Sequence, residues 1–438
     1  SYLASLERLH VEVATRNNLV GGSEASIAGA GAFLFGRQSH RRQGLEPLSL
    51  GPRAKILQQL EQSAIIPHVA ESEDAHYPYE VLFRSVHKLL MDTATSEYLF
   101  CTDFFGEGSV FNELFQATLS VVEGALSGAL QDHFDAIGLL LMIRINFQHQ
   151  LVMSRRRLPC LDHYLDRVNL MLWPRFKIVL ESHINSVRQA NEKPSQNDTG
   201  PHPVACRYGE LAAAMHVLNT NYQDQQLDVQ LERLESAVID FLTRASHHFN
   251  PRLNGMIFLI NNLNHVIVTL REAQPVAVGS SSNQSESSGE KGTLGASAAA
   301  SLQHFEDQLS GCTSTYVEEQ LRVFFDKLID FVRRAETQLR SSSGGVSSEA
   351  AAMAKPIVAD FSKRWKNSIE ILHKETSSHF TSSVCGMEVL KAAMTQLLLY
   401  YTRLLELLKK AGPEGQALTR EAVSIPSIMY EIKKLTRT

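Results

Sequence analysis

The sequence is poor in cysteine and lacks a long hydrophobic run. Its five cysteines stand singly, without a CxxC pair, which argues against a disulfide framework and against a cysteine-rich zinc module. The longest strongly apolar run, IGLLLMI at 137–143, is far shorter than the roughly 18–20 residues of a membrane-spanning helix. No signal peptide opens the chain, and its first residue is Ser1 rather than Met. These absences favour a soluble protein, or part of one, in the reducing cytosol.

An excess of positive charge is also missing. Lys and Arg number 42 against 47 Asp and Glu, a formal net charge of −5. Nucleic-acid-binding proteins usually carry a clustered basic excess that neutralises phosphates, and membrane-surface anchors carry a polybasic segment. We therefore expect no nucleic-acid ligand and no membrane anchor within this sequence. Hydrophobic residues make up 44% of the chain, which is enough to bury sizeable cores.

Motifs for catalysis or cofactor binding are scarce. The sequence contains no GxxxxGK[ST], HExxH, GxSxG or EF-hand pattern. Gly29, Gly31 and Gly36 approach a dinucleotide fingerprint, but the third glycine is misplaced and no strand precedes them. The adjacent His247 and His248 would point about 100° apart on a helix and could not share an ion. We therefore expect no catalytic residue, no cofactor and no metal site.

Helical periodicity dominates the patterned part of the sequence. Apolar residues recur every three or four positions, which gives a helix one apolar face, and only PVAV at 275–278 hints at a strand. Asp224 is a suitable N-cap for one of these helices, and Pro174 should kink or break another near Trp173. The segments with this spacing are 2–16, 161–188, 227–241, 317–331 and 390–408. In 317–331 the expected core positions are Val317, Leu321, Phe324, Leu328 and Phe331.

Glycine, proline and serine concentrate in stretches that separate the helical segments. One of them, the Ser/Gly/Ala tract at 279–301, has no aromatic residue and is predicted to be disordered. Long amphipathic segments joined by short polar breaks predict an all-α protein of packed helical bundles. We expect an N-terminal helix and glycine-rich loop at 1–66, a first helical bundle at 67–195, and one or more C-terminal bundles at 196–438.

Two patches combine aromatic residues with arginine. YPYEVLFRSVHKLL at 77–90 contains Tyr79, Phe83 and Arg84, and LWPRF at 172–176 contains Trp173 and Arg175. Interface anchors have this composition, so these five residues are candidates for a protein interface. The alternative is that the aromatic rings are core residues and that Arg84 is a buried ion-pair partner.

Six ordered blocks of the sequence resemble a known family, the fifty-second vacuolar protein sorting subunit. Members belong to the Golgi-associated retrograde protein (GARP) tethering complex and its endosomal counterpart. The resemblance extends from about Tyr2 to Lys434, although 279–301 looks like an insertion and 21–36 is longer than in the family. The N-terminal coiled-coil region of the family is absent, so we expect this chain to be part of a longer protein. The blocks are YPYEVLFRSVHKLLMDTATSEYLFCTDFF (77–105), LPCLDHYLDRVNLMLWPRFKIVLESHINSVR (158–188), RYGELAAAMHVLN (207–219), FLINNLNHVIVTLRE (258–272), WKNSIEILHKETSSHF (365–380) and YEIKK (430–434).

The resemblance implies a fold and a function. The fold would be an elongated rod of stacked helical bundles, as in multisubunit vesicle-tethering complexes. The function would be non-enzymatic tethering in retrograde transport from endosomes to the trans-Golgi network, at the cytosolic face of both compartments. Partners would be other tethering subunits, SNAREs and a Rab-type GTPase, and membrane association would be peripheral, through these partners. The residues by themselves leave open a general helical scaffold and a helical enzyme whose site is assembled from distant residues.

Overall fold

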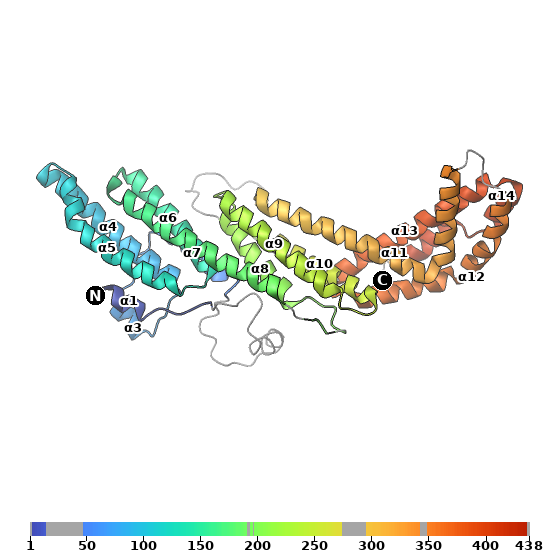
Figure 1. Cartoon of the computed structure of the whole chain (residues 1–438), viewed down its shortest axis with the longest axis horizontal. Coiled ribbons are helices and arrows are strands. Elements are labelled where there is room, and N and C mark those ends of the chain that lie inside the picture. The colour runs from blue at the N-terminus through green and yellow to red at the C-terminus, as the bar shows by residue number, and fades with distance from the viewer. Residues whose placement is uncertain are drawn as a thin grey trace. The chain divides into compact units, whose positions relative to one another are not determined.

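Helices make up most of the part of the chain that the computed structural model describes, which comprises residues 2–14, 47–190, 193–195, 197–273, 295–341 and 348–435 (Figure 1). Within these ranges no β-strand forms, and one isolated backbone bridge joins His10 to Tyr77. The predicted all-α fold is therefore confirmed. Gly29, Gly31, Gly36, the PVAV segment and most of the 279–301 tract lie outside the described residues.

The chain folds into two compact units. Unit 1 comprises Ser1–Asn191, Pro203–Phe241 and Val266–Gln303, and unit 2 comprises Glu192–His202, Leu242–His265 and His304–Thr438. This division does not coincide with the boundaries expected at 66/67 and 195/196, because the segment Pro203–Phe241 packs within unit 1. A helical chain that returns to an earlier bundle gives no compositional signal at that point.

Unit 1 is built around a bundle of long helices. Helix α4 contacts α5 and α6, and α7 contacts the same two helices, so these four form a bundle; α4 and α5 are a hairpin at the blue end of Figure 1. Three further helices, α9 (Gln225–Ser246), α10 (Arg252–Glu272) and α11 (Ala296–Ser341), contribute residues to both units. The other elements of unit 1 are α1 (Tyr2–Glu7), η1 (Gly51–Gln58), α3 (Pro67–Ser72), α4 (Tyr79–Phe105), α5 (Ser109–Gln131), α6 (Ala136–Arg156), η2 (Pro159–Leu161), α7 (Asp162–Gln189) and α8 (Pro203–Asn219).

Helix α6 is the core helix of unit 1. Every residue from Ala136 to Asn146 is buried, so this part of the helix has no solvent face. Asp135 caps its start, because the Oδ1 atom accepts a hydrogen bond from the backbone N–H of Gly138 at 2.9 Å. Helices α6 and α10 are long and apolar enough to cross a membrane, but 72% and 61% of these stretches are buried inside the protein. Burial in a protein core accounts for their apolar composition.

Unit 2 is centred on α13. Its helices after α11 are α12 (Ser348–His379), α13 (Ser383–Lys410), α14 (Gly412–Glu421) and α15 (Ile425–Leu435). Helix α13 contacts each of the other three, and Ser382 caps its start by accepting from the backbone N–H of Cys385 at 3.3 Å. The apolar seam predicted in 390–408 is confirmed, because its residues are all buried: Leu390, Met394, Leu397, Tyr401, Leu404 and Leu408.

Two other predicted apolar faces are also confirmed. In α9, Asp224 precedes the first residue, and its Oδ1 atom accepts from the backbone N–H of Gln226 at 3.0 Å, as expected of an N-cap. The apolar positions of α9 and α7 face the core. They are Leu227, Leu231, Leu234, Val238 and Phe241 in α9, and Leu161, Leu165, Val168, Leu172, Phe176, Val179 and Val187 at and along α7, all at most 4% exposed.

The helix predicted over 2–16 is shorter than expected, and the last part of the tract predicted to be disordered is helical. The helix expected over 2–16 ends at Glu7, and the backbone of Leu9 and Val11 then exchanges hydrogen bonds with Tyr77 at 2.8 and 2.9 Å. Helix α11 begins at Ala296, so residues 296–301 of the tract predicted to be disordered are helical. Alanine has the highest helix propensity of all residues, and the sequence ASAAAS follows that preference.

Two details of helix interiors also differ from expectation. Helix α7 continues through Pro174 without the break considered from the sequence. Pro174 and Leu170, four residues before it, are both exposed, so the carbonyl that loses its helical partner can reach water. In α11, Phe325 departs from helical torsion angles (φ −132°), and the core positions are Phe325 and Val332 rather than Phe324 and Phe331.

Candidate functional site

The first aromatic and basic patch lies in the opening turns of α4, and most of it faces inward. Glu80, Phe83, Arg84 and His87 follow one another at intervals of three, one and three residues and are all buried. Residues three and four apart lie on the same side of a helix. This side of α4 therefore forms part of the interior of unit 1.

A buried ionic network joins this side of α4 to two other elements. Arg53 of η1 donates from Nε to Glu80 Oε1 at 2.7 Å and from Nη2 to Asp135 Oδ2. All three side chains are almost fully buried. Burial raises the pKa of Glu80, Arg53 opposes this rise, and Asp135 adds to it. Because Asp135 also caps α6, the network connects η1, α4 and α6.

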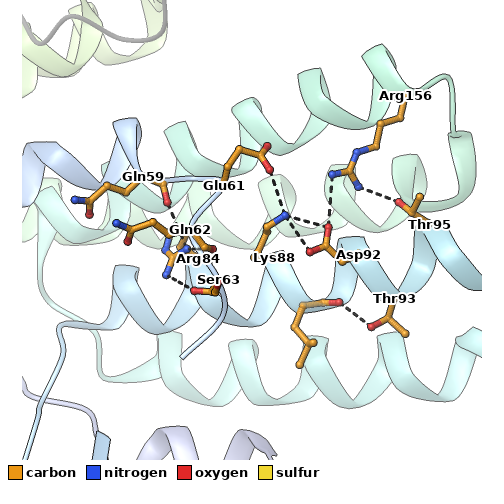
Figure 2. Close-up of polar contacts among 11 residues, drawn as sticks. Gln59, Glu61, Gln62, Ser63, Arg84, Lys88, Asp92, Thr93, Thr95 and Arg156 are labelled. Carbon is orange, nitrogen blue, oxygen red and sulfur yellow. Dashed lines mark hydrogen bonds and ion pairs between the residues drawn. The ribbon is translucent and has the colours of Figure 1, made fainter. Parts of the chain in front are cut away.

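Arg84 holds a loop rather than an acidic side chain. Its Nη1 atom donates to the carbonyl oxygens of Gln62 at 2.8 Å and Gln59 at 3.4 Å, and Nη2 donates to that of Ser63 at 3.4 Å (Figure 2). The expectation that a buried Arg84 would form an ion pair was therefore wrong. Burial lowers the pKa of Arg84, and backbone carbonyls supply the acceptors that a buried guanidinium requires.

The next turns of α4 carry a more exposed charge network. Lys88 lies 3.2 Å from a carboxylate oxygen of Glu61 and 2.9 Å from one of Asp92. Arg156, at the end of α6, lies 3.5 Å from Asp92 and donates to Thr95 Oγ1 at 3.0 Å (Figure 2). Burial lowers the pKa of Lys88, but its hydrogen bonds to Asp92 and Glu61 raise it by more. The last residue of α6 is thus level with Asp92 and Thr95, and the rest of α4 extends beyond it.

The structure brings residues from the two patches to one turn. Tyr79 lies between the rings of His10 and His133, with centroid distances of 5.6 and 5.7 Å, and burial raises the pKa of Tyr79. Arg175 donates from Nε to the carbonyl oxygen of His133 at 3.0 Å, and its guanidinium lies 4.7 Å from the ring centroid of Phe134. The turn at 133–134 thus connects the two patches, which lie far apart in the sequence.

The five interface candidates differ in their access to solvent. Phe83 and Arg84 are 3% and 4% exposed, so a partner could not contact them directly in this structure. Tyr79, Trp173 and Arg175 are half-buried, and the Trp173 ring packs edge-on against Phe176 at 5.7 Å. These three are the members of the set that solvent can reach.

Sequence reasoning missed a more exposed apolar group at the end of the α4–α5 hairpin. Phe100, Phe104 and Phe105 of α4 are 54%, 71% and 50% exposed, and Leu99 and Leu114 are 47% and 63% exposed. The signal was present in the segment YLFCTDFF at 98–105, where three phenylalanines fall within six residues. Their exposure could not be predicted without knowing that α4 extends past the end of α6.

A cavity of about 620 Å³ lies beside Tyr79, between the N-terminal segment, α4 and α5. Its lining is mostly apolar and includes His10, His133 and Asp135. Burial lowers the pKa of His133 to about 4 and also lowers that of His10, so both rings are neutral near pH 7. Asp135 is held by Arg53 and the backbone of Gly138. Its carboxylate is therefore occupied by contacts that hold the fold.

His87 is likewise engaged in structure, and the buried Cys385 is not an activated nucleophile. His87 Nδ1 lies 2.8 Å from the carbonyl oxygen of Phe83 and donates to it, which leaves Nε2 to accept from the Tyr164 hydroxyl at 3.0 Å. Burial raises the pKa of the Cys385 thiol to about 11, the opposite of what an activated nucleophile needs. No cluster of three or more His, Cys, Asp or Glu side chains in the described ranges could hold a metal ion.

Comparisons with known proteins identify relatives along the whole chain. The chain is 45% identical over 439 residues to "Vacuolar protein sorting-associated protein 52 A" of Arabidopsis thaliana, which covers 100% of this chain and 58% of that protein. It is 29% identical over 443 residues to the Homo sapiens homologue (99% and 58%) and 26% identical over 440 residues to that of Caenorhabditis elegans (97% and 59%). The chain therefore spans less than two thirds of the length of these relatives.

Family comparisons give two matches. One is "Exocyst complex component Sec3, C-terminal", over residues 216–411. The other is "Vps52, C-terminal", over residues 1–291 of the 438 in the chain. The second match covers more than half of the sequence and includes the aromatic blocks of α4 and α7. The chain belongs to the Vps52 family.

Proposed function

We propose that this chain is the helical, C-terminal part of a subunit of a vesicle-tethering complex. Membership of the Vps52 family carries the proposal, because relatives in this family are named vacuolar protein sorting proteins. The match of residues 216–411 to the C-terminal part of an exocyst component supports it. The buried Arg53–Glu80–Asp135 network is consistent with a non-enzymatic role, because it joins η1, α4 and α6.

The mechanism would be geometric. Helices of 28 residues such as α7 and α13 each span about 42 Å at 1.5 Å per residue, so helical units can separate distant contact sites. We propose that these sites bind other tethering subunits, SNAREs and a Rab-type GTPase during transport from endosomes to the trans-Golgi network. Tyr79, Trp173 and Arg175 are candidate contacts. Several weak contacts on one complex would act together through multivalency.

The test is to tag the protein at its own chromosomal locus and to identify the proteins that co-purify with it. Recovery of other tethering-complex subunits, and of a Rab-type GTPase only when it is loaded with GTP, is expected. An accompanying transport assay should show cargo retained in endosomes when the protein is depleted. Normal cargo transport, together with recovery of partners from outside membrane traffic, would replace the proposal with a general helical scaffold.

A further inference from the structure

Helices α4 and α5 share an apolar face that points to solvent. It consists of Leu89, Phe100 and Phe104 on α4 and Leu114 and Val121 on α5, and is called the hairpin face. Their exposed fractions lie between 43% and 71%. Intervals of eleven and four residues along α4, and of seven along α5, keep the members on one side of each helix. Exposed apolar patches rimmed by polar residues are typical of interaction sites.

A groove runs beside the hairpin face. It has a volume of about 460 Å³ and is lined by Leu89 and Thr93 of α4 and by Thr118 and Val121 of α5, with Leu3 of α1 among its other lining residues. The groove lies between the two antiparallel helices of the hairpin, with lining residues from both. This is the form that accepts the side chains of a third helix laid along the pair.

Aromatic side chains lie at the end of the hairpin, beyond the residues that line this groove. The rings of Phe100 and Phe104 are stacked with centroids 5.4 Å apart, and Phe105 meets Phe104 edge-on at 4.9 Å. All three rings contact one another while at least half of each side chain is exposed. Exposed aromatic side chains that already hold one another lose little conformational freedom when a partner covers them.

The charge around the hairpin face has one sign. Between Leu89 and Asp132 the sequence contains seven acidic residues and no Lys, Arg or His. Two of the seven, Asp92 and Glu123, pair with Lys88, Arg156 or Arg167 of this chain. Three others remain exposed and form no ion pair with any residue that the structure describes: Glu97, Asp103 and Glu113.

We propose that the hairpin face binds an amphipathic helix of a partner protein, whose apolar stripe is flanked by Lys or Arg. The apolar side chains would cover Phe104, Leu114 and the groove, and the basic side chains would face Glu97, Asp103 and Glu113. A second copy of this hairpin would bring the same acidic residues, and an anionic membrane would be repelled by them. Charge therefore selects a basic helix. The inference does not depend on the tethering function.

The test uses the whole chain and a fluorescein-labelled peptide of about 18 residues, made of Leu, Ala and Lys with Leu on one helical face. Fluorescence anisotropy should show saturable binding that weakens as salt is added. Phe104→Asp should raise Kd by at least about tenfold. The matched control is Leu170→Asp, because Leu170 of α7 is 74% exposed but lies outside the hairpin face; its Kd should equal that of the unaltered chain.

The charge contribution is tested by Glu97→Lys combined with Glu113→Lys. This variant should bind the Lys peptide more weakly and should gain affinity for a version of the peptide with Glu in place of Lys. Circular dichroism would confirm that each variant is folded, and Leu114→Asp provides a second test of the apolar contact.

Three results would overturn the proposal. The first is an absence of peptide binding, or binding that Leu170→Asp and Phe104→Asp weaken equally. The second is sedimentation of the chain with neutral phosphatidylcholine vesicles that Phe104→Asp abolishes, without peptide binding, which would assign the face to a lipid surface. The third is a dimer that Phe104→Asp dissociates, which would assign it to a second copy.

Discussion

The interiors of the two units differ in chemistry. Unit 1 buries charged side chains and histidines, including Arg53, Glu80 and Arg144. In unit 2, by contrast, the buried polar side chains among the described residues are hydroxyls and amides, such as Asn261 and Thr376. The core of unit 2 is otherwise made of apolar residues from α10 to α15. The two units therefore reach stability by different means.

Arg144 shows how unit 1 uses buried charge. Its Nε donates to the carbonyl oxygen of Leu218 at 3.1 Å, and its Nη2 donates to Asn219 Oδ1 at 3.1 Å. The guanidinium also lies 3.4 Å from Asp224 and 4.3 Å from the ring centroid of Tyr222. Each contact has a required direction, so Arg144 fixes the turn between α8 and α9 against α6. Such a network is costly if any one partner is lost.

The α13 seam of unit 2 relies on contacts without a required direction. The seam of α13 is apolar except for the Tyr401 hydroxyl, which donates to the carbonyl oxygen of Val423 at 2.8 Å. The Tyr401 ring stacks on that of Phe361 at 4.5 Å. Hydrophobic contacts respond weakly to pH and tolerate substitutions that preserve volume. We therefore expect unit 1 to be the more sensitive to pH and to single changes of charge.

Acid should reveal the largest difference in stability between the two units. Burial lowers the pKa of His87, His133, His183 and His216 from 6.5 to about 4. The unfolded chain takes up these protons near pH 6.5, whereas the folded chain does not until about pH 4. The unfolding free energy is therefore unaffected by these histidines above pH 6.5. It falls as the pH falls towards 4, by on the order of 3 kcal/mol for each histidine. Glu80, whose pKa is raised, acts in the opposite direction.

The chain offers a separate reporter for each unit. Its two tryptophans are Trp173 in unit 1 and Trp365 in unit 2, so Trp365→Phe and Trp173→Phe leave one fluorophore each. Changing the pH from 7 to 4.5 should lower the urea midpoint reported by Trp173 far more than the midpoint reported by Trp365. His183→Leu should flatten this pH dependence. Equal losses in both units would contradict the comparison.

Removing Arg53, one of the buried cations of unit 1, should have the next largest effect. Arg53→Met leaves Glu80 and Asp135 buried without a counterion, which should cost about 3–5 kcal/mol of unfolding free energy. Adding Glu80→Gln should recover part of the loss, because the amide carries no charge. Urea unfolding followed through Trp173 measures both variants. A loss below about 1 kcal/mol would mean that the network contributes little to stability.

The same contrast explains which parts of the fold were predictable. In α7, α9 and α13 one face is apolar and the other polar, so the spacing of Leu390, Met394 and Leu397 alone identified the buried side. In α6 the residues from Ala136 to Asn146 are buried on every side, so no period marks a face. The extended segment after Glu7 was missed because its backbone partner, Tyr77, is far away in the sequence.

The candidate site was less predictable than the fold. An aromatic and basic patch has the same composition whether it binds a partner or builds a core. Arg84 is buried because carbonyl groups at 59–63 surround it, and that loop lies more than twenty residues away. Phe104 is exposed because α6 ends beside Asp92, whereas α4, with 27 residues, continues to Phe105. Both facts depend on how helices align, which local sequence does not specify.

A large-to-small substitution in the core of unit 2 should rank third. Leu404 is fully buried in the seam of α13, so Leu404→Ala should cost about 3 kcal/mol through lost burial and the cavity that remains. Leu399→Ala is the matched control on the same helix, because Leu399 is 42% exposed, and should change stability by less than about 1 kcal/mol. Urea unfolding followed through Trp365 should show the same loss of unfolding free energy for Leu404→Ala at pH 7 and at pH 4.5.

The smallest effect should come from an arginine of unit 2 that, like Arg53, pairs with a glutamate but is exposed to solvent. Arg333 lies 2.5 Å from Glu318 and donates to the Tyr400 hydroxyl at 3.2 Å, yet its side chain is 46% exposed. Water stabilises both charges once they are separated, so Arg333→Ala should cost at most about 1 kcal/mol, and less in high salt. Urea unfolding through Trp365 provides the value to compare with Arg53→Met. Equal costs for the two arginines would show that burial does not set the energy of these networks, and the proposed difference between the units would then fail.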